Sequence, residues 1–146
     1  MRLRGMGMRQ LVIIGLCLFG LVGCENSTAP SLGVPFSVTD LEVGTGETAT
    51  SSSTVLIRYT GWLYSAGATD NKGTVFDTTG AFGSQCFSLG STIPGFGQGI
   101  AGMREGGRRL IVIPPELGYG DQANGSVPAN STLIFEVELL SIGCNF

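Results

Sequence analysis

Apolar and polar positions alternate most regularly near the end of the chain. In the segment STLIFEVELLSI, residues 131–142, the acidic Glu136 and Glu138 are interleaved with apolar side chains: Leu133, Phe135, Val137 and Leu139. A period of two places such apolar side chains on one face of a β-strand and the polar ones on the other. Shorter patterns of the same kind predict three further strands, at residues 36–43, 54–63 and 110–113.

One segment, GFGQGIAGMR at residues 95–104, is expected to be helical. Its glycines lower the intrinsic helix propensity, so we expect the packing of Phe96, Ile100 and Met103 to hold it. A chain in which strands dominate and one short helix occurs indicates an α+β domain, with an antiparallel sheet wrapped on one face around that helix.

The first 35 residues differ from the rest. Residues 1–9 carry three arginines and no acid, and residues 10–23 are apolar over the length of a signal peptide. The following box, LVGC, resembles the lipobox of bacterial lipoproteins, in which the thiol of Cys24 would be lipidated. The alternative is an ordinary secretory signal that a cysteine follows by chance. We predict a signal peptide at 1–23, a lipidated cysteine with a flexible Ser/Pro/Gly-rich tether at 24–35, and a folded domain at 36–146.

This organisation predicts an extracytoplasmic protein that its N-terminal lipid anchors to the membrane of the bacterial cell envelope. Glu25 follows the cysteine where inner-membrane lipoproteins often have aspartate, which favours the outer membrane if the cell has one.

Charge and composition exclude several classes of function. Loss of residues 1–23 removes three of the eight basic residues and leaves eleven acidic ones, so nucleic acid is not an expected partner. The chain has no histidine, which excludes histidine-based triads and most zinc sites. A GxGxxG match at residues 97–102 is not fed by a strand and is not part of a βαβ unit, so it predicts no dinucleotide. We expect neither a cofactor nor a metal.

Two cysteines, Cys86 and Cys144, would remain in the mature domain after lipidation of Cys24. In a compartment that permits disulfides, an even pair favours a structural disulfide over two free thiols. A metal site is disfavoured because no CxxC spacing or histidine supports it.

Five ordered motifs identify the domain more specifically: RYTGWL at 58–63, VFDTT at 75–79, IPGF at 93–96, PPELGYG at 114–120 and VPANSTLIFEVELL at 127–140. Together they closely resemble the FKBP-type peptidylprolyl isomerases, the macrolide-binding immunophilins, from about residue 36 to 142. The resemblance implies an FKBP-like fold, in which a twisted five-stranded antiparallel sheet wraps around one short helix.

The resemblance also implies peptidylprolyl cis-trans isomerase activity during the folding of secreted or envelope proteins, with proline-containing polypeptides and macrolide immunosuppressant-type ligands as partners. The X-Pro bond faces a rotational barrier of about 18–20 kcal/mol from amide resonance. An apolar pocket that binds the twisted amide lowers this barrier without any covalent bond. The alternatives are a chaperone-like module that binds proline-containing segments with little turnover, and a structural lipoprotein that uses the fold as a spacer.

The same resemblance implies the roles of individual residues. Phe96 would form the floor under the proline ring, and the other substrate-binding residues would be walls or rim: Tyr59, Phe76, Phe87, Val127 and Phe135. The backbone N–H of Ile93 and the hydroxyl of Tyr119 would bind substrate carbonyls, and Asp77 would steer the twisting carbonyl electrostatically. Taken singly, such aromatic residues are more often plain core.

The chain departs from the family pattern at several positions. Phe96 stands where tryptophan is usual, which implies a deeper or looser pocket, and Gln85 stands where many members have an aromatic residue. No arginine lies between Asp77 and Phe87 to pair with the aspartate, so we expect Asp77 to be held differently. The turn at residues 90–93 is shorter than usual, and the segment 64–74 is longer.

Overall fold

A computed structural model describes residues 33–145 of the 146-residue chain. The expected signal peptide, the lipidation site at Cys24 and the tether up to Leu32 lie outside these residues. Within residues 33–145, no helix has the length and apolar character needed to cross a membrane.

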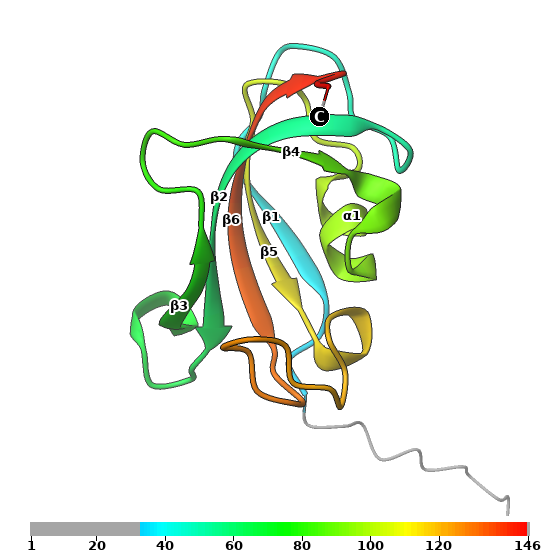
Figure 1. The fold of residues 1–146 in the computed structure, drawn as a ribbon. Helices are drawn as coiled ribbons and strands as arrows, with labels where there is room; N and C mark the ends of the chain where they lie inside the picture. Colours follow the sequence, from blue (N-terminus) through cyan, green and yellow to red (C-terminus); the bar gives the residue numbers. More distant parts are fainter. Residues whose placement is uncertain (1–32, 146) are drawn as a thin grey trace, which may run out of the picture. The chain divides into compact units, whose positions relative to one another are not determined.

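The domain is an antiparallel sheet with one short helix, which confirms the FKBP-like fold class (Figure 1). The strand order is β1-β5-β6-β2-β3, and β4 pairs with β2 beside this path. Six strands are thus present where five were expected. The bounds of the elements are β1 Ser37–Glu42, β2 Thr54–Tyr64, β3 Lys72–Thr78, β4 Gln85–Ser88, α1 Pro94–Ile100, β5 Arg108–Ile113 and β6 Leu133–Ile142.

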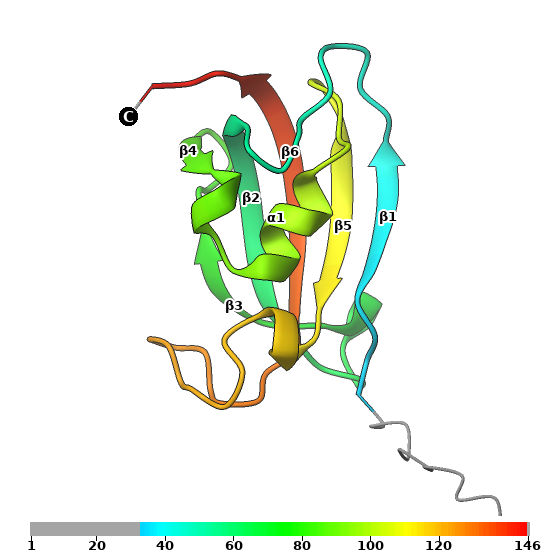
Figure 2. The ribbon, with the colours of Figure 1, turned by 90° about the vertical axis from the view of Figure 1, so that its right-hand side faces the viewer.

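The core lies between α1 and the face of the sheet that the helix covers (Figure 2). The two longest strands supply much of it because their apolar residues alternate. In β2 the buried side chains are those of Val55, Ile57 and Tyr59, and in β6 the alternation buries Val137 and Leu139. The period of two therefore selects which face of each strand is covered.

Glycines allow α1 to approach the sheet closely. A Cβ at Gly99 would lie 2.5 Å from Cγ2 of Ile111, and one at Gly95 would lie 2.5 Å from Cγ2 of Ile113. The packing of this segment against β5 thus requires glycines, although glycine is a poor helix former.

The helix begins at Pro94 and ends at Ile100, which shortens the expected 95–104 segment at its C-terminal end. Ala101 is extended, with ψ 134°, and Gly102 has φ +84°, so the chain leaves the helical conformation there. Met103 still packs in the core, from the turn that follows.

Strands β3 and β4 were not predicted from the hydrophobic pattern. Most of β3 is exposed, and none of the four residues of β4 is fully buried, so neither strand has the alternation that buried faces impose. The long segment at 64–74 is also more ordered than a plain loop, because it contains the end of β2, a short 3₁₀ turn at Thr69–Asn71 and the start of β3.

A disulfide joins Cys86 of β4 to Cys144, which follows β6, with the two Cα atoms 6.1 Å apart. The pairing connects strands that are not hydrogen-bonded to each other, since both β4 and β6 pair with β2.

Candidate functional site

A cavity of about 300 Å³ opens on the helix-covered side of the sheet. Its walls come from most parts of the fold: strands β2, β3, β4 and β6, the turn before α1, the helix itself and the loop after β5. The lining residues are Tyr59, Phe76, Asp77, Phe87, Ser91, Thr92, Ile93, Phe96, Tyr119 and Phe135.

Five aromatic rings form the apolar part of the cavity. Phe96 is central, because its ring centroid lies 4.8 Å from that of Phe135, 5.8 Å from that of Phe87 and 6.0 Å from that of Tyr59. Phe76 packs on the far side of Phe135 at 5.4 Å. All four contacts are edge-to-face, the geometry that aromatic quadrupoles favour, so the rings hold one another in a concave arrangement.

The absence of a side chain at Gly61 makes room for two of these rings. A Cβ at this position of β2 would lie 2.8 Å from Cζ of Phe76 and 2.9 Å from Cε1 of Phe135. The glycine in the motif RYTGWL is therefore part of the construction of the cavity.

Asp77 lies exposed at the cavity and is held by a tyrosine. The hydroxyl of Tyr59 donates to Oδ2 of Asp77 at 2.6 Å. Burial, followed by this hydrogen bond and the charge of Asp77, raises the pKa of Tyr59 well above its ordinary value. Burial and the same negative charge also raise the pKa of Tyr119. Both phenols therefore remain protonated donors at neutral pH.

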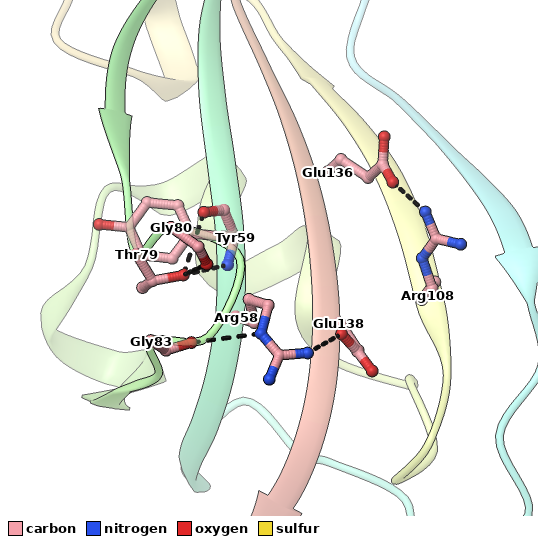
Figure 3. A network of polar contacts seen from close by, with 8 residues as sticks. All are labelled: Arg58, Tyr59, Thr79, Gly80, Gly83, Arg108, Glu136 and Glu138. Atoms are coloured by element: carbon pink, nitrogen blue, oxygen red, sulfur yellow. Dashed lines mark hydrogen bonds and ion pairs between the residues drawn. The ribbon is translucent and has the colours of Figure 1, made fainter.

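No arginine reaches Asp77 among the described residues. The nearest candidate in sequence, Arg58, is directed to the other face of the sheet, where its Nη1 donates to Glu138 at 2.7 Å and its Nε to the carbonyl of Gly83 at 3.3 Å (Figure 3). Asp77 is thus oriented by a neutral hydroxyl.

Two further donors are available at the cavity. Ile93 accepts hydrogen bonds at its carbonyl from the N–H groups of Phe96 and Gly97, but within residues 33–145 its own N–H has no protein acceptor. The hydroxyl of Tyr119 likewise has no side-chain hydrogen bond in this part of the chain. Both groups can donate to a ligand carbonyl.

A larger hollow of about 610 Å³ lies on the opposite face of the sheet. Its charged residues pair with one another, as Figure 3 shows for Arg58 with Glu138 and for Arg108 with Glu136. Paired charges over an exposed sheet face bind an apolar ring poorly, so the smaller aromatic cavity is the candidate functional site.

The structure brings together every expected pocket residue except Val127. This residue is 3% exposed and packs in the core, and it does not line the cavity. Its backbone and that of Asn124 exchange two hydrogen bonds of 2.8 and 2.9 Å, which close a tight turn and hold the valine below the surface. The expected rim position for Val127 is therefore wrong.

Two lining residues, Ser91 and Thr92, were missed by the sequence reasoning. The hydroxyl of Thr92 donates to the carbonyl of Leu89 at 2.9 Å, which fixes the turn that presents the N–H of Ile93. Their position directly before the IPGF motif was the signal that could have found them.

Comparisons with known proteins give the family and the fold of this chain. Residues 45–140 match the family model of FKBP-type peptidyl-prolyl cis-trans isomerase. The chain is 45% identical over 105 residues to FK506-binding protein 3 of Debaryomyces hansenii, with 70% of this chain and 22% of that protein covered. It therefore spans about a fifth of the length of this relative.

Two other relatives are similar over a larger share of their length. FK506-binding protein of Neisseria meningitidis is 38% identical over 109 residues, which cover 72% of this chain and 94% of that protein. Among solved structures, the crystal structure of FkpA from Escherichia coli superposes with a TM-score of 0.63 at 38% identity, covering 73% of this chain and 47% of that one.

Proposed function

This chain belongs to the FKBP-type peptidyl-prolyl cis-trans isomerase family, and we propose that its aromatic cavity accelerates the rotation of X-Pro bonds in polypeptides. The observation that carries the proposal is the combination, in one cavity, of five packed aromatic rings with a carboxylate and two donors that have no acceptor within residues 33–145. This combination suits a proline ring and the preceding carbonyl group, which rotates about the X-Pro bond.

The aromatic rings supply the main binding energy in this proposal. A proline ring seated on Phe96 is surrounded by apolar surface and shielded from water. The planar amide has a large dipole that water stabilises, whereas the twisted amide has lost resonance and is less dipolar. A dry pocket therefore binds the twisted form more tightly than the planar one, and this difference lowers the barrier.

The polar groups orient the turning carbonyl. The N–H of Ile93 and the hydroxyl of Tyr119 donate to carbonyls of the substrate and fix its position over the rings. The carboxylate of Asp77 repels the carbonyl oxygen and favours rotation away from itself. Tyr59 keeps the carboxylate in one orientation. No covalent bond is made or broken at any step.

Ligands other than substrate are also proposed for this cavity. The relatives are named FK506-binding proteins. The cavity of about 300 Å³ is largely apolar and has few polar groups, as small-molecule sites generally do. We therefore include macrolide immunosuppressant-type molecules among the proposed ligands.

The cellular role we propose is assistance to the folding of secreted or envelope proteins. Unaided isomerisation takes tens to hundreds of seconds and can limit folding. The support lies in the apolar segment and LVGC box at the start of the sequence. If Cys24 is lipidated, the full chain will label with radioactive palmitate in a bacterial host and a Cys24→Ala chain will not; equal labelling would contradict the anchor.

A protease-coupled isomerisation assay on an X-Pro peptide tests the enzymatic proposal. The parent, Phe96→Ala and Asp77→Ala proteins are compared at equal concentration. We expect the parent to accelerate isomerisation in proportion to its concentration and both variants to lose most of the effect. Peptide binding by the parent without acceleration would instead show a proline-binding module with little turnover.

A further inference from the structure

We propose that the Cys86–Cys144 disulfide is a positioning device for the pocket wall formed by Phe87, so that the cross-link sets the affinity of the cavity for its substrate. The inference deepens the proposed function and rests on it, because it assigns a role in substrate binding to two residues that do not line the cavity.

Strand β4, which carries Phe87, is weakly held by its noncovalent contacts. It has four residues, β2 is its one partner among the described strands, and none of its side chains is fully buried. Beyond this pairing, Arg58 donates to the carbonyl of Gly83 before the strand at 3.3 Å, and the N–H of Leu89 donates to Ser53 after it at 3.0 Å. A short edge strand with so few buried side chains opens readily.

The two faces of β4 carry different functions. Phe87 lies opposite Val55 and Cys86 lies opposite Leu56, so successive side chains point to opposite faces of the sheet. Val55 is fully buried on the helix side, which places Phe87 on that side, in the wall of the cavity. Cys86 is therefore behind the strand, where a cross-link holds the wall without occupying the cavity.

The other end of the disulfide follows β6, the central strand of the sheet path. Ile142, the last residue of β6, lies opposite Val55 from the other side of β2, and the N–H of Gly143 donates to the carbonyl of Thr54 at 2.8 Å. Figure 2 shows the red end of β6 continuing past β2 toward the side of β4. The bridge to Cys144 therefore spans β2 and ties the edge strand to β6.

Loss of the Cys86–Cys144 disulfide should move the Phe87 ring away from its neighbours. The centroid of that ring lies 5.7 Å from that of Tyr59 and 5.8 Å from that of Phe96, both in edge-to-face contact, and these contacts close one side of the aromatic cavity. Phe96 is the central ring of the cavity and Phe87 only a side wall, so we expect the loss of Phe87 to remove contact surface from the planar and the twisted amide alike. Its displacement should therefore raise KM more than it lowers kcat.

A double-mutant cycle on isomerase kinetics tests the inference. The disulfide is removed by Cys86→Ser/Cys144→Ser in the parent and in a Phe87→Leu background, and circular dichroism checks the fold of all four proteins. If the cross-link acts through Phe87, its removal will lower kcat/KM about fivefold or more in the parent, mainly through KM, and less than about twofold in the Phe87→Leu background. A disulfide that serves only the stability of the fold would change kcat/KM by the same factor in both backgrounds.

An unchanged kcat/KM after removal of the disulfide, or equal losses in the two backgrounds, would overturn the inference. If the serine pair does not fold, the cycle is run with Cys86→Val/Cys144→Ala, which keeps a β-branched residue in the strand. If the parent itself has no turnover, the proposed function fails separately. The same cycle is then measured as the Kd of the X-Pro peptide, with the same two outcomes.

Discussion

The hydroxyl of Tyr59 donates to the carboxylate of Asp77 across the mouth of the cavity, at 2.6 Å. The bond joins β2 to β3 close to a shift in their register, which follows the pairing of Gly61 with Asp77. Because the tyrosine ring also packs against Phe87, Phe96 and Phe135, one residue both forms the apolar wall and orients the acid. The polar and the aromatic parts of the site are thus coupled through Tyr59.

The first prediction concerns a variant that removes the hydrogen bond between Tyr59 and Asp77. We expect Tyr59→Phe to keep the aromatic packing and to lower kcat/KM about three- to tenfold, a loss of about 0.7–1.4 kcal/mol of transition-state stabilisation, because the carboxylate would lose the hydrogen bond that orients it. Steady-state kinetics on an X-Pro peptide measures the effect. Tyr64→Phe, at the end of the same strand and outside the cavity, is the matched control. Equal kinetics of the two variants would contradict the role of the bond.

The second prediction concerns alkaline pH. Burial and Asp77 raise the pKa values of Tyr59 and Tyr119 above the ordinary 10.0, so the folded protein keeps phenolic protons that the unfolded chain releases. This contribution to stability is complete below pH 10 and is lost as the pH rises further. Denaturant unfolding between pH 8 and 11 should show a decline above pH 10 that is smaller in Tyr59→Phe. A parent curve that stays flat to pH 11 would refute the assignment.

The third prediction concerns a variant that adds a methyl group at Gly61. A methyl group there would contact Phe76 and Phe135 at less than 3 Å and push both rings into the cavity. We expect Gly61→Ala to lose most isomerase activity and about 1–3 kcal/mol of stability. Gly67→Ala, where a Cβ would meet nothing within 4 Å, is the control and should match the parent. Full activity in Gly61→Ala would show that the rings are not held as described.

The fourth prediction concerns the opposite face of the sheet. Burial alone would raise the pKa of Glu136, but hydrogen bonds from Lys72 and Arg108 outweigh it and lower the pKa below its ordinary value. The resulting stabilisation is present above pH 4.5 and is lost as the pH falls further. Because these pairs are partly exposed, we expect Glu136→Gln to cost at most about 1 kcal/mol at pH 7. Activity should be unchanged, since the residue lies away from the cavity; a loss of activity would contradict this separation.

The sequence predicted those strands that have one buried face. The alternation at 54–63 and 131–142 predicted β2 and β6 almost to the residue, because burial alternates along most of β2 and, in β6, from Phe135 to Leu139. It missed β3, where Val75 is 47% exposed, and β4, which is too short to have a period. The helix end at Ile100 was also missed, because the left-handed conformation of Gly102 depends on the turn in which it lies.

The site could be predicted only from the five ordered motifs taken together. Phe96 and Phe135 are 4% and 5% exposed, so burial alone cannot distinguish them from core residues. The bond between Tyr59 and Asp77 could not be foreseen, because it depends on the register between two strands. Val127 was misplaced for a similar reason: a local turn, not its residue type, decides which side of the loop it faces.

The most direct test of the central claim measures binding and isomerisation on one sample. Exchange NMR on an X-Pro peptide gives the cis-trans rate at catalytic amounts of protein, and titration of the same peptide gives its Kd. We predict that the parent accelerates exchange saturably, and that Phe96→Leu lowers kcat/KM about tenfold or more while the fold is retained. Exchange at the uncatalysed rate in the presence of the parent, or equal acceleration by Phe96→Leu, would contradict the account.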